Sequence, residues 1–173
     1  MQERTQLLQL RFCVDERSAG GRVTQSCVQT GYRTTGVQHG GSHTGEAVLF
    51  VPNDPRAVTV CRRTLRLILT LHGLITLVDT AELLAAELIS NAVLHTKGPA
   101  ALRVRHSPGV LRLGAWDADP EPPDPPRPLA QLTGAENGRG LSLIRACADV
   151  WGWQPQSRNG SRGKYVWCEL AAA

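Results

Sequence analysis

The chain has 173 residues, enough for one domain with a buried core, and its 42% hydrophobic and 20% charged residues are typical of a globular protein. The net charge of +4 comes from scattered arginines, and two Phe and two Tyr offer few rings for base stacking, so direct nucleic-acid binding is disfavoured. Charges interrupt the apolar stretches, which argues against a membrane span, and the N-terminus lacks a secretory pattern, so we expect a cytoplasmic protein.

Residues 1–45 differ in composition from the rest of the chain. From Ser18 to Gly45 the sequence consists mainly of Gly, Ser, Thr and Gln, without a sustained period of 2 or 3.6 residues. Leu7–Val14 fits either a short helix or a short strand. We therefore expect a poorly structured N-terminal extension over residues 1–45, followed by one folded domain over residues 46–173.

The five cysteines include no C-x-x-C pair, and their number is odd. Both properties disfavour a disulfide framework or a zinc site. We expect reduced cysteines that fill small apolar positions.

The folded domain is predicted to begin with a strand and two helices. Ala47–Val51 predicts a strand that ends at a proline. Asn53-Asp54-Pro55 is typical of a helix start, because a capping side chain precedes a proline, and it predicts a helix over Arg56–Leu71. A second helix is predicted over Val78–His95, with Asp79 or Thr80 near its cap.

The second half predicts four strands and a third helix around a long loop. Residues 118–137 hold six of the eleven prolines, and a loop of this length is either functional or disordered. The predicted elements are the strands Ala101–His106 and Val110–Trp116, the helix Leu141–Asp149, and the strands Val150–Gln154 and Lys164–Leu170. This order predicts an α/β (α+β) two-layer sandwich, a mainly antiparallel mixed sheet covered on one face by helices.

Two polar residues stand out on the second predicted helix. Glu87 and Asn91 lie one turn apart, and most of the remaining helix is apolar. An unpaired buried carboxylate is costly, so a polar group is expected opposite it. Two interpretations stay open at this point. In the structural one, Glu87 and Asn91 form an exposed stripe, or Glu87 pairs with Arg103 or Arg105. In the functional one, they belong to a binding site.

Coordination chemistry indicates which ligand such a binding site would hold. Mg²⁺ takes oxygen ligands and commonly combines one or two protein oxygens with the phosphates of a substrate. The side-chain oxygen of Asn91 suits that role. Glu87, one turn earlier, suits a general base that deprotonates an incoming hydroxyl or water.

Two features of the second half fit a nucleotide. Asp117 ends the series of core-facing positions on its strand, where it either caps the next loop or accepts a hydrogen bond from the exocyclic amine of adenine. Gly138-Arg139-Gly140 follows the long loop and precedes a helix. Glycines let the backbone approach phosphate oxygens, a helix N-terminus offers free N–H groups, and Arg139 can pair with a phosphate.

These features, in this order, resemble the GHKL (Bergerat-fold) ATPase superfamily, and most of all the short bacterial anti-sigma-factor serine/threonine kinases, which have a histidine kinase-like ATPase domain. The resemblance covers about residues 47–170. The family pattern D-x-G-x-G is absent, because Asp119 and Pro120 stand in the stretch that follows Asp117. The motifs that carry the resemblance are Phe50-Val-Pro52, Glu87-Leu-Ile-Ser-Asn91-Ala-Val-Leu-His95-Thr96, Trp116-Asp-Ala-Asp-Pro120, Gly138-Arg-Gly-Leu-Ser-Leu-Ile144, Asp149-x-Trp151-Gly152 and Gly163-Lys-x-Val-Trp167.

The resemblance implies that residues 46–173 are a histidine kinase-like domain that binds ATP and Mg²⁺. Asn91 would coordinate Mg²⁺, Glu87 would be the catalytic base, and Asp117 would bind the adenine amine. The residues that would meet the phosphates are Gly138, Arg139, Gly140 and Leu141. The implied acceptor is a serine or threonine of a small anti-sigma-factor antagonist protein. A sigma factor is the alternative partner, and such kinases commonly form homodimers.

Two functions stay open on the sequence. One is a serine/threonine protein kinase that also binds and silences a sigma factor, and the other is an ATP-binding regulatory module that binds partners without phosphotransfer. A sensor histidine kinase is disfavoured, because residues 1–45 show no heptads for a dimerising helical hairpin. A DNA-binding protein would rest on the charge of +4 alone.

Overall fold

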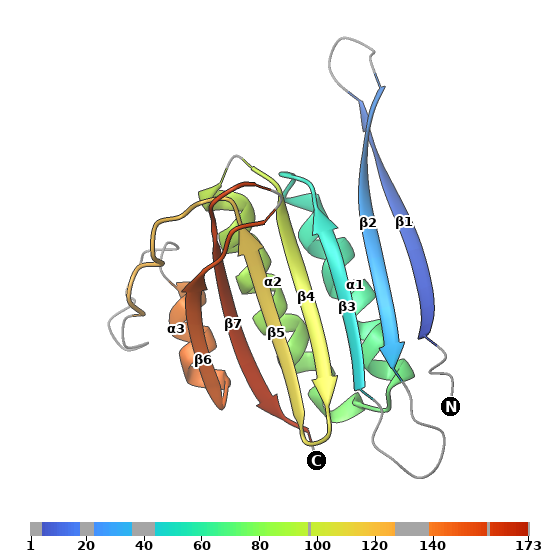
Figure 1. The fold of residues 1–173 in the computed structure, drawn as a ribbon, viewed down its shortest axis with the longest axis vertical. Helices are drawn as coiled ribbons and strands as arrows, with labels where there is room; N and C mark the ends of the chain where they lie inside the picture. Colours follow the sequence, from blue (N-terminus) through green and yellow to red (C-terminus); the bar gives the residue numbers. More distant parts are fainter. Residues whose placement is uncertain are drawn as a thin grey trace.

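The computed structural model describes residues 5–17, 23–35, 44–96, 98–126, 139–158 and 160–172, with the backbone alone for residues 5–17 and 23–35. Its strands form one sheet in the order β1-β2-β3-β4-β5-β7-β6 (Figure 1). The strands are β1 (Thr5–Arg17), β2 (Val23–Thr35), β3 (Thr44–Val51), β4 (Ala100–Ser107), β5 (Val110–Asp117), β6 (Val150–Pro155) and β7 (Lys164–Ala171).

Three helices cover one face of the five strands β3 to β7 (Figure 1). They are α1 (Arg56–Leu71), α2 (Val78–His95) and α3 (Arg139–Cys147), and the short 3-10 helix η1 (Ile75–Leu77) leads into α2. The prediction of an α+β arrangement with helices on one face of a sheet is thereby confirmed.

The predicted mixture of parallel and antiparallel pairs is wrong for the described strands, which all pair antiparallel. The reason lies in the connection between β3 and β4. A single helix between two neighbouring strands makes them parallel. Here the two helices α1 and α2 connect β3 to β4, so the chain reverses direction once more and β4 runs antiparallel to β3.

The prediction of a poorly structured extension over residues 1–45 stays a prediction, although the backbone of residues 5–17 and 23–35 is described as the strands β1 and β2. The two strands pair along their whole length, and β2 continues the sheet beside β3. A period of two residues runs through β1, with apolar residues at Leu8, Leu10, Phe12 and Val14, and this alternation favours a strand. Whether residues 1–45 and 46–173 are separate domains stays a prediction.

The core lies between the sheet and the helices. Helix α1 contributes Cys61, Leu65 and Leu69, which are at most 1% exposed. The sheet contributes its alternate positions, among them Leu102 and Leu113, both fully buried. Cys168 is also buried in this core, as expected for a reduced cysteine in a small apolar position.

The bounds of α1 and α2 follow the predictions, whereas α3 begins and ends two residues earlier than the predicted helix Leu141–Asp149. Asp54 accepts a hydrogen bond from the backbone N–H of Arg56 at 2.9 Å, which satisfies a free donor at the start of α1. Asp79 lies in the first turn of α2, near the cap as predicted. The capping position is Leu77, without a side-chain hydrogen bond, because η1 feeds the chain directly into the helix.

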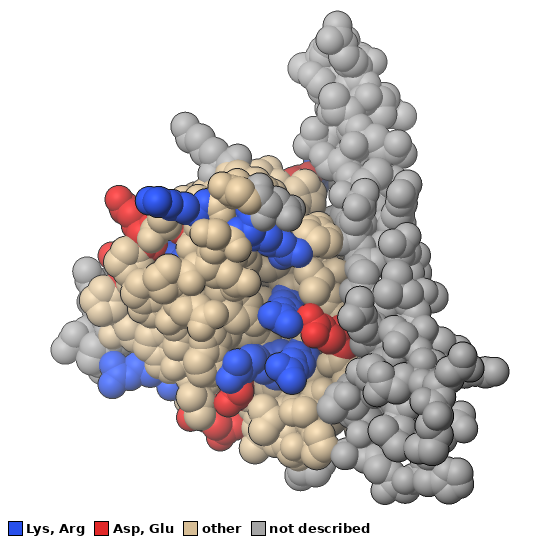
Figure 2. All heavy atoms as spheres, viewed as in Figure 1, with Lys and Arg blue, Asp and Glu red and all other residues tan. Residues whose placement is uncertain are grey.

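The opposite face of the sheet has no helix over it among the described residues, and positively charged side chains gather there (Figure 2). Its β4 and β5 positions include Arg103, Arg105 and Arg112. None of the described helices is both long and apolar enough to cross a membrane.

Candidate functional site

Helix α2 carries two of the residues of the candidate site. Its apolar sides pack against the sheet and the neighbouring helices, so that Leu84, Leu88 and Ile89 are buried. Glu87 and Asn91 are half-buried and lie at the border between this packed surface and solvent. The helix therefore presents a carboxylate and a carboxamide, one turn apart, at an accessible edge.

The first turn of α3 lies directly against these two groups. A Cβ atom placed on Gly140 would come within 2.8 Å of Asn91 Nδ2 and 2.9 Å of Glu87 Oε2. Only a residue without a side chain permits this approach with both polar groups in their present positions. The structure thus brings together three of the residues that the sequence predicts for the site: Glu87, Asn91 and Gly140.

The structure describes only part of the other residues predicted to meet the phosphates. Leu141 is half-buried and packs against the core, so it supports the turn from the apolar side. Arg139 is the first residue of α3, but its side chain lies outside the described part of the structure. Gly138 also lies outside it.

The suggested pairing of Glu87 with Arg103 or Arg105 is wrong. Arg103 donates from Nε to Glu46 Oε1 at 2.9 Å, and both arginines line hollows on the uncovered face of the sheet. Within the described residues, Glu87 has no ion pair. The account in which Glu87 is a structural partner of these arginines therefore fails.

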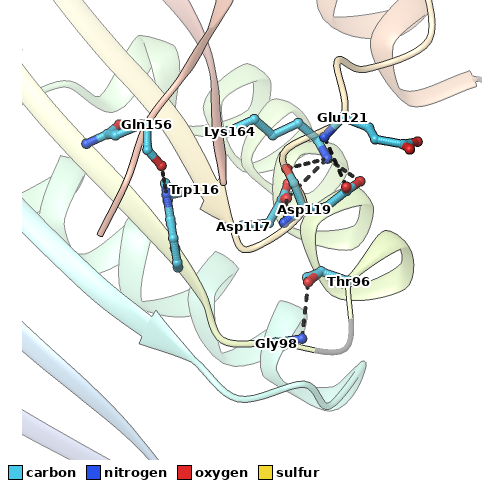
Figure 3. A network of polar contacts seen from close by, with 8 residues as sticks. All are labelled: Thr96, Gly98, Trp116, Asp117, Asp119, Glu121, Gln156 and Lys164. Atoms are coloured by element: carbon cyan, nitrogen blue, oxygen red, sulfur yellow. Dashed lines mark hydrogen bonds and ion pairs between the residues drawn. The ribbon is translucent and has the colours of Figure 1, made fainter. Parts of the chain in front are cut away.

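The other predicted residue, Asp117, occupies the end of β5 and is 3% exposed. Its Oδ1 accepts a hydrogen bond from the backbone N–H of Asp119 at 2.9 Å and lies 3.1 Å from Lys164 Nζ (Figure 3). Both contacts go to the same oxygen, so Oδ2 keeps its capacity to accept a hydrogen bond. Asp117 thus caps the next loop, as the structural alternative predicted, and still retains an oxygen for a ligand.

Lys164 ties the two aspartates together. Its Nζ lies 2.7 Å from Asp119 Oδ2, and Lys164 itself is 6% exposed. Burial raises the pKa of Asp117, against the opposing hydrogen bonds from Asp119 N–H and Lys164. The hydrogen bond from Lys164 lowers the pKa of Asp119, so the ammonium holds this outer carboxylate in its charged form.

Sequence reasoning does not identify Lys164 as a site residue. A lysine at the start of a strand is ordinary, and its position opposite Asp117 depends on the register of β5 and β7. Gly163 makes the close approach of these strands feasible, since a Cβ atom there would collide with the backbone oxygen of Asp117. The Gly163-Lys164 pair is the local signal from which the contact follows once the register is known.

The two groups of polar residues lie along the same helix. His95, the last residue of α2, is close enough to Asp119 for its charge to lower the pKa of that carboxyl group. At 1.5 Å per residue, the eight residues from Glu87 to His95 span about 12 Å. An acceptor carboxylate therefore lies at one end of this span, and Glu87, Asn91 and the N-terminus of α3 lie at the other.

No group of three or more His, Cys, Asp or Glu side chains that could hold a metal ion occurs in the described ranges. Asn91 and Glu87 instead offer one amide oxygen and one carboxylate beside the first turn of α3. This donor set suits Mg²⁺ that is held mainly by the phosphates of a ligand. Neither of the two hollows on the other face of the sheet is lined by Glu87, Asn91 or Asp117.

Comparison of the chain with protein-family models and with curated proteins found no match. The fold is that of an α+β protein with an antiparallel sheet packed against three helices.

Proposed function

We propose that this chain is a Mg-ATP-binding protein of the GHKL (Bergerat-fold) type. The observation that carries the proposal is the packing of Gly140 against Glu87 and Asn91, with Asp117 near the far end of the same helix. Glu87 has no ion-pair partner among the described residues, and the Gly140 backbone and the Asn91 amide lie beside it.

The adenine end of the ligand is proposed to lie at Asp117. An exocyclic amine donates hydrogen bonds, and Oδ2 is an acceptor without a described partner. Lys164 supports this role, because its contact with Oδ1 favours the charged form of the buried carboxylate and holds it in place. Asp119 pairs with the same ammonium, so the two aspartates share one positive charge.

The phosphate end is proposed to lie at α3. Its first turn offers N–H groups and the positive end of the helix dipole, and Gly138 and Arg139 directly precede Gly140. The side-chain oxygen of Asn91 would hold Mg²⁺, which supplies positive charge to the phosphates when it is bound. Glu87 would keep one carboxylate oxygen beside the terminal phosphate.

The reaction that we propose is phosphotransfer to a protein hydroxyl. Glu87 would accept the proton of a serine or threonine hydroxyl, in the role of a general base. The acceptor would belong to a small anti-sigma-factor antagonist, with a sigma factor as the alternative partner. These partners, the homodimer and the cytoplasmic location rest on the family resemblance.

Nucleotide binding is tested by titration calorimetry with Mg-ATP. Asn91→Ala should weaken the affinity by at least about tenfold, as expected for a lost metal ligand. Asp117→Asn should weaken ATP binding and reduce the preference for ATP over GTP. Asp79→Asn is the matched control, because Asp79 is exposed in the first turn of α2 and pairs only on the surface. The absence of Mg-ATP binding by the unaltered chain would overturn the proposal, and an unchanged affinity in Asn91→Ala would overturn the metal assignment.

Phosphotransfer is tested separately with radiolabelled ATP and candidate antagonist proteins. Glu87→Ala should abolish labelling of the antagonist while Mg-ATP is still bound. Unchanged labelling would exclude Glu87 as the base. Nucleotide binding without transfer to any antagonist would instead favour the ATP-dependent regulatory module without kinase activity.

A further inference from the structure

The uncovered face of the sheet carries a basic surface that the nucleotide site does not use. We call it the arginine face and define it by Arg103 and Arg105 of β4, Arg112 of β5 and Arg158 of the loop between β6 and β7. Two adjoining hollows of about 250 Å³ and about 110 Å³ open on it, and both are lined by Arg103, Gln156 and Tyr165 (Figure 2).

Two glycines let aromatic rings lie flat between these arginines. Tyr165 occupies the space in which a side chain on Gly114 would stand, and Trp167 lies 2.9 Å from the position of a Cβ atom on Gly152. Arg112 in turn lies over the Trp167 ring at 4.2 Å. The two rings therefore form part of the floor of the arginine face, and Arg112 packs on one of them.

The positive charges of this face exceed the negative ones. Arg103 pairs with Glu46 at 2.9 Å, and Arg112 pairs with Glu169 at 2.7 Å. Arg105 and Arg158 have no carboxylate partner among the described residues. Arg158 is half-buried over the Phe50 ring, and burial followed by the charge of Arg103 lowers its pKa. An anion here would relieve the repulsion between these two guanidinium groups.

Two other kinds of occupant fit less well. Single-stranded nucleic acid binds by stacking its bases on open rings, but Trp116 and Tyr165 are only 5% and 7% exposed. A second copy of the chain would bring the same positive face against itself, and like charges repel. Carboxylates of an acidic protein segment match the planar guanidinium groups of Arg105 and Arg158.

We propose that the arginine face binds an acidic segment of a partner protein, with Arg105 and Arg158 as the residues that pair with its carboxylates. This surface lies on the other side of the sheet from Glu87 and Asn91. The inference is therefore independent of nucleotide binding, and either one can fail without the other.

The test uses the full chain labelled with ¹⁵N and a decaglutamate peptide as the probe. The four tryptophans divide by strand register into Trp116 and Trp167 on the arginine face and Trp151 and Trp153 on the helix-covered side. Titration should shift the indole N–H signals of the first pair and leave those of the second pair in place. The Trp116 indole is a sensitive reporter, because it donates a hydrogen bond to the backbone oxygen of Gln156 at 2.8 Å.

The double variant Arg105→Gln with Arg158→Gln should bind decaglutamate at least about tenfold more weakly, because charged hydrogen bonds are lost. The charge-matched control is Arg63→Gln with Arg145→Gln, two exposed positions on α1 and α3, and it should change the affinity by less than about twofold.

Four results would overturn the proposal. Equal losses in both double variants, or shifts at all four indoles, would show a non-specific effect of charge. Tighter binding of decathymidylate through the same two arginines would assign the face to nucleic acid. Dimerisation of the free chain through Arg105 and Arg158, measured by sedimentation, would assign it to a second copy.

Discussion

Single glycines determine how closely segments of this protein approach each other, and two of them do so with different consequences. Gly114 lies beneath Tyr165, a residue that is 7% exposed. Gly140 lies against the outer atoms of Glu87 and Asn91, which are half-buried and can rotate toward solvent. The same methyl group should therefore affect stability at one position and ligand binding at the other.

Gly114→Ala should lower the free energy of unfolding by about 1–3 kcal/mol, because a displaced buried ring strains its neighbours. Gly140→Ala should leave stability within about 1 kcal/mol, since alanine favours a helix, and should weaken Mg-ATP binding by about tenfold. Urea unfolding and calorimetry of both variants measure the two effects. A stable Gly114→Ala protein, or a Gly140→Ala protein with full affinity, would contradict the respective contact.

At the scale of secondary-structure elements, the strand pair β5–β7 depends on a buried charge network. Lys164 opens β7 and reaches Asp117 at the end of β5 and Asp119 just beyond it. Removal of one partner from a buried ion pair leaves the others without compensation, which is more costly than the pair is stabilising.

Lys164→Met should reduce the free energy of unfolding at neutral pH by about 3–5 kcal/mol. In the unaltered protein Asp119 has a lowered pKa, so its contribution is present above the ordinary value of 3.8 and is lost as the pH falls. Asp117 has a raised pKa, so its contribution is greatest at low pH and is lost as the pH rises. Without Lys164 both carboxyl groups hold protons at higher pH in the folded state.

The deficit of Lys164→Met should therefore be largest near pH 7 and shrink toward pH 4, as measured by urea unfolding at both values. An equal deficit at the two pH values would mean that Lys164 acts through packing alone.

The sequence predicts some of these elements far better than others. Both bounds of α1 and α2 follow from it, because their apolar periodicity is long and proline or glycine flanks α1. The strand β2 could not be predicted, because its residues are mostly polar and its strand character depends on pairing with β1 and β3. The hydrogen bond from Arg66 of α1 to Glu82 of α2, at 2.9 Å, could not be predicted either, because it is set by how the helices pack.

The candidate site shows the same division between local and long-range information. The stripe of Glu87 and Asn91 is a local pattern, so the sequence identifies it. The neighbours of those residues are not local, since Gly140 lies 49 positions beyond Asn91 and contacts it only through the packing of α3 on α2. Lys164 escapes prediction for this reason, because sheet register places it opposite Asp117.

At the scale of the whole molecule, one sheet separates two surfaces of different chemistry. The helix-covered side encloses the core and the candidate nucleotide site, and the other side carries the arginine face. Thiol chemistry can test this division, because burial raises the pKa of Cys61 and of Cys168 to about 12, whereas Cys147 is exposed on α3.

Iodoacetamide at pH 8 should label Cys147 quickly and should label Cys61 and Cys168 only when the core opens. Mass spectrometry of the peptides measures the three rates. Saturating Mg-ATP should slow labelling at Cys61 and Cys168 further, because a ligand that binds the native state reduces the population of open states. Labelling of the two buried thiols as fast as Cys147 would contradict the described core.

Lys164 has a further consequence for covalent chemistry. It is one of two lysines among the nineteen basic residues of the chain, so an acylating reagent finds very few amines. An ammonium group held by two carboxylates and 6% exposed reacts only after the start of β7 separates from β5. The acylation rate of Lys164 would therefore report how often the sheet opens beside Asp117. A bound nucleotide would lower this acylation rate, so the native amine itself would report nucleotide binding.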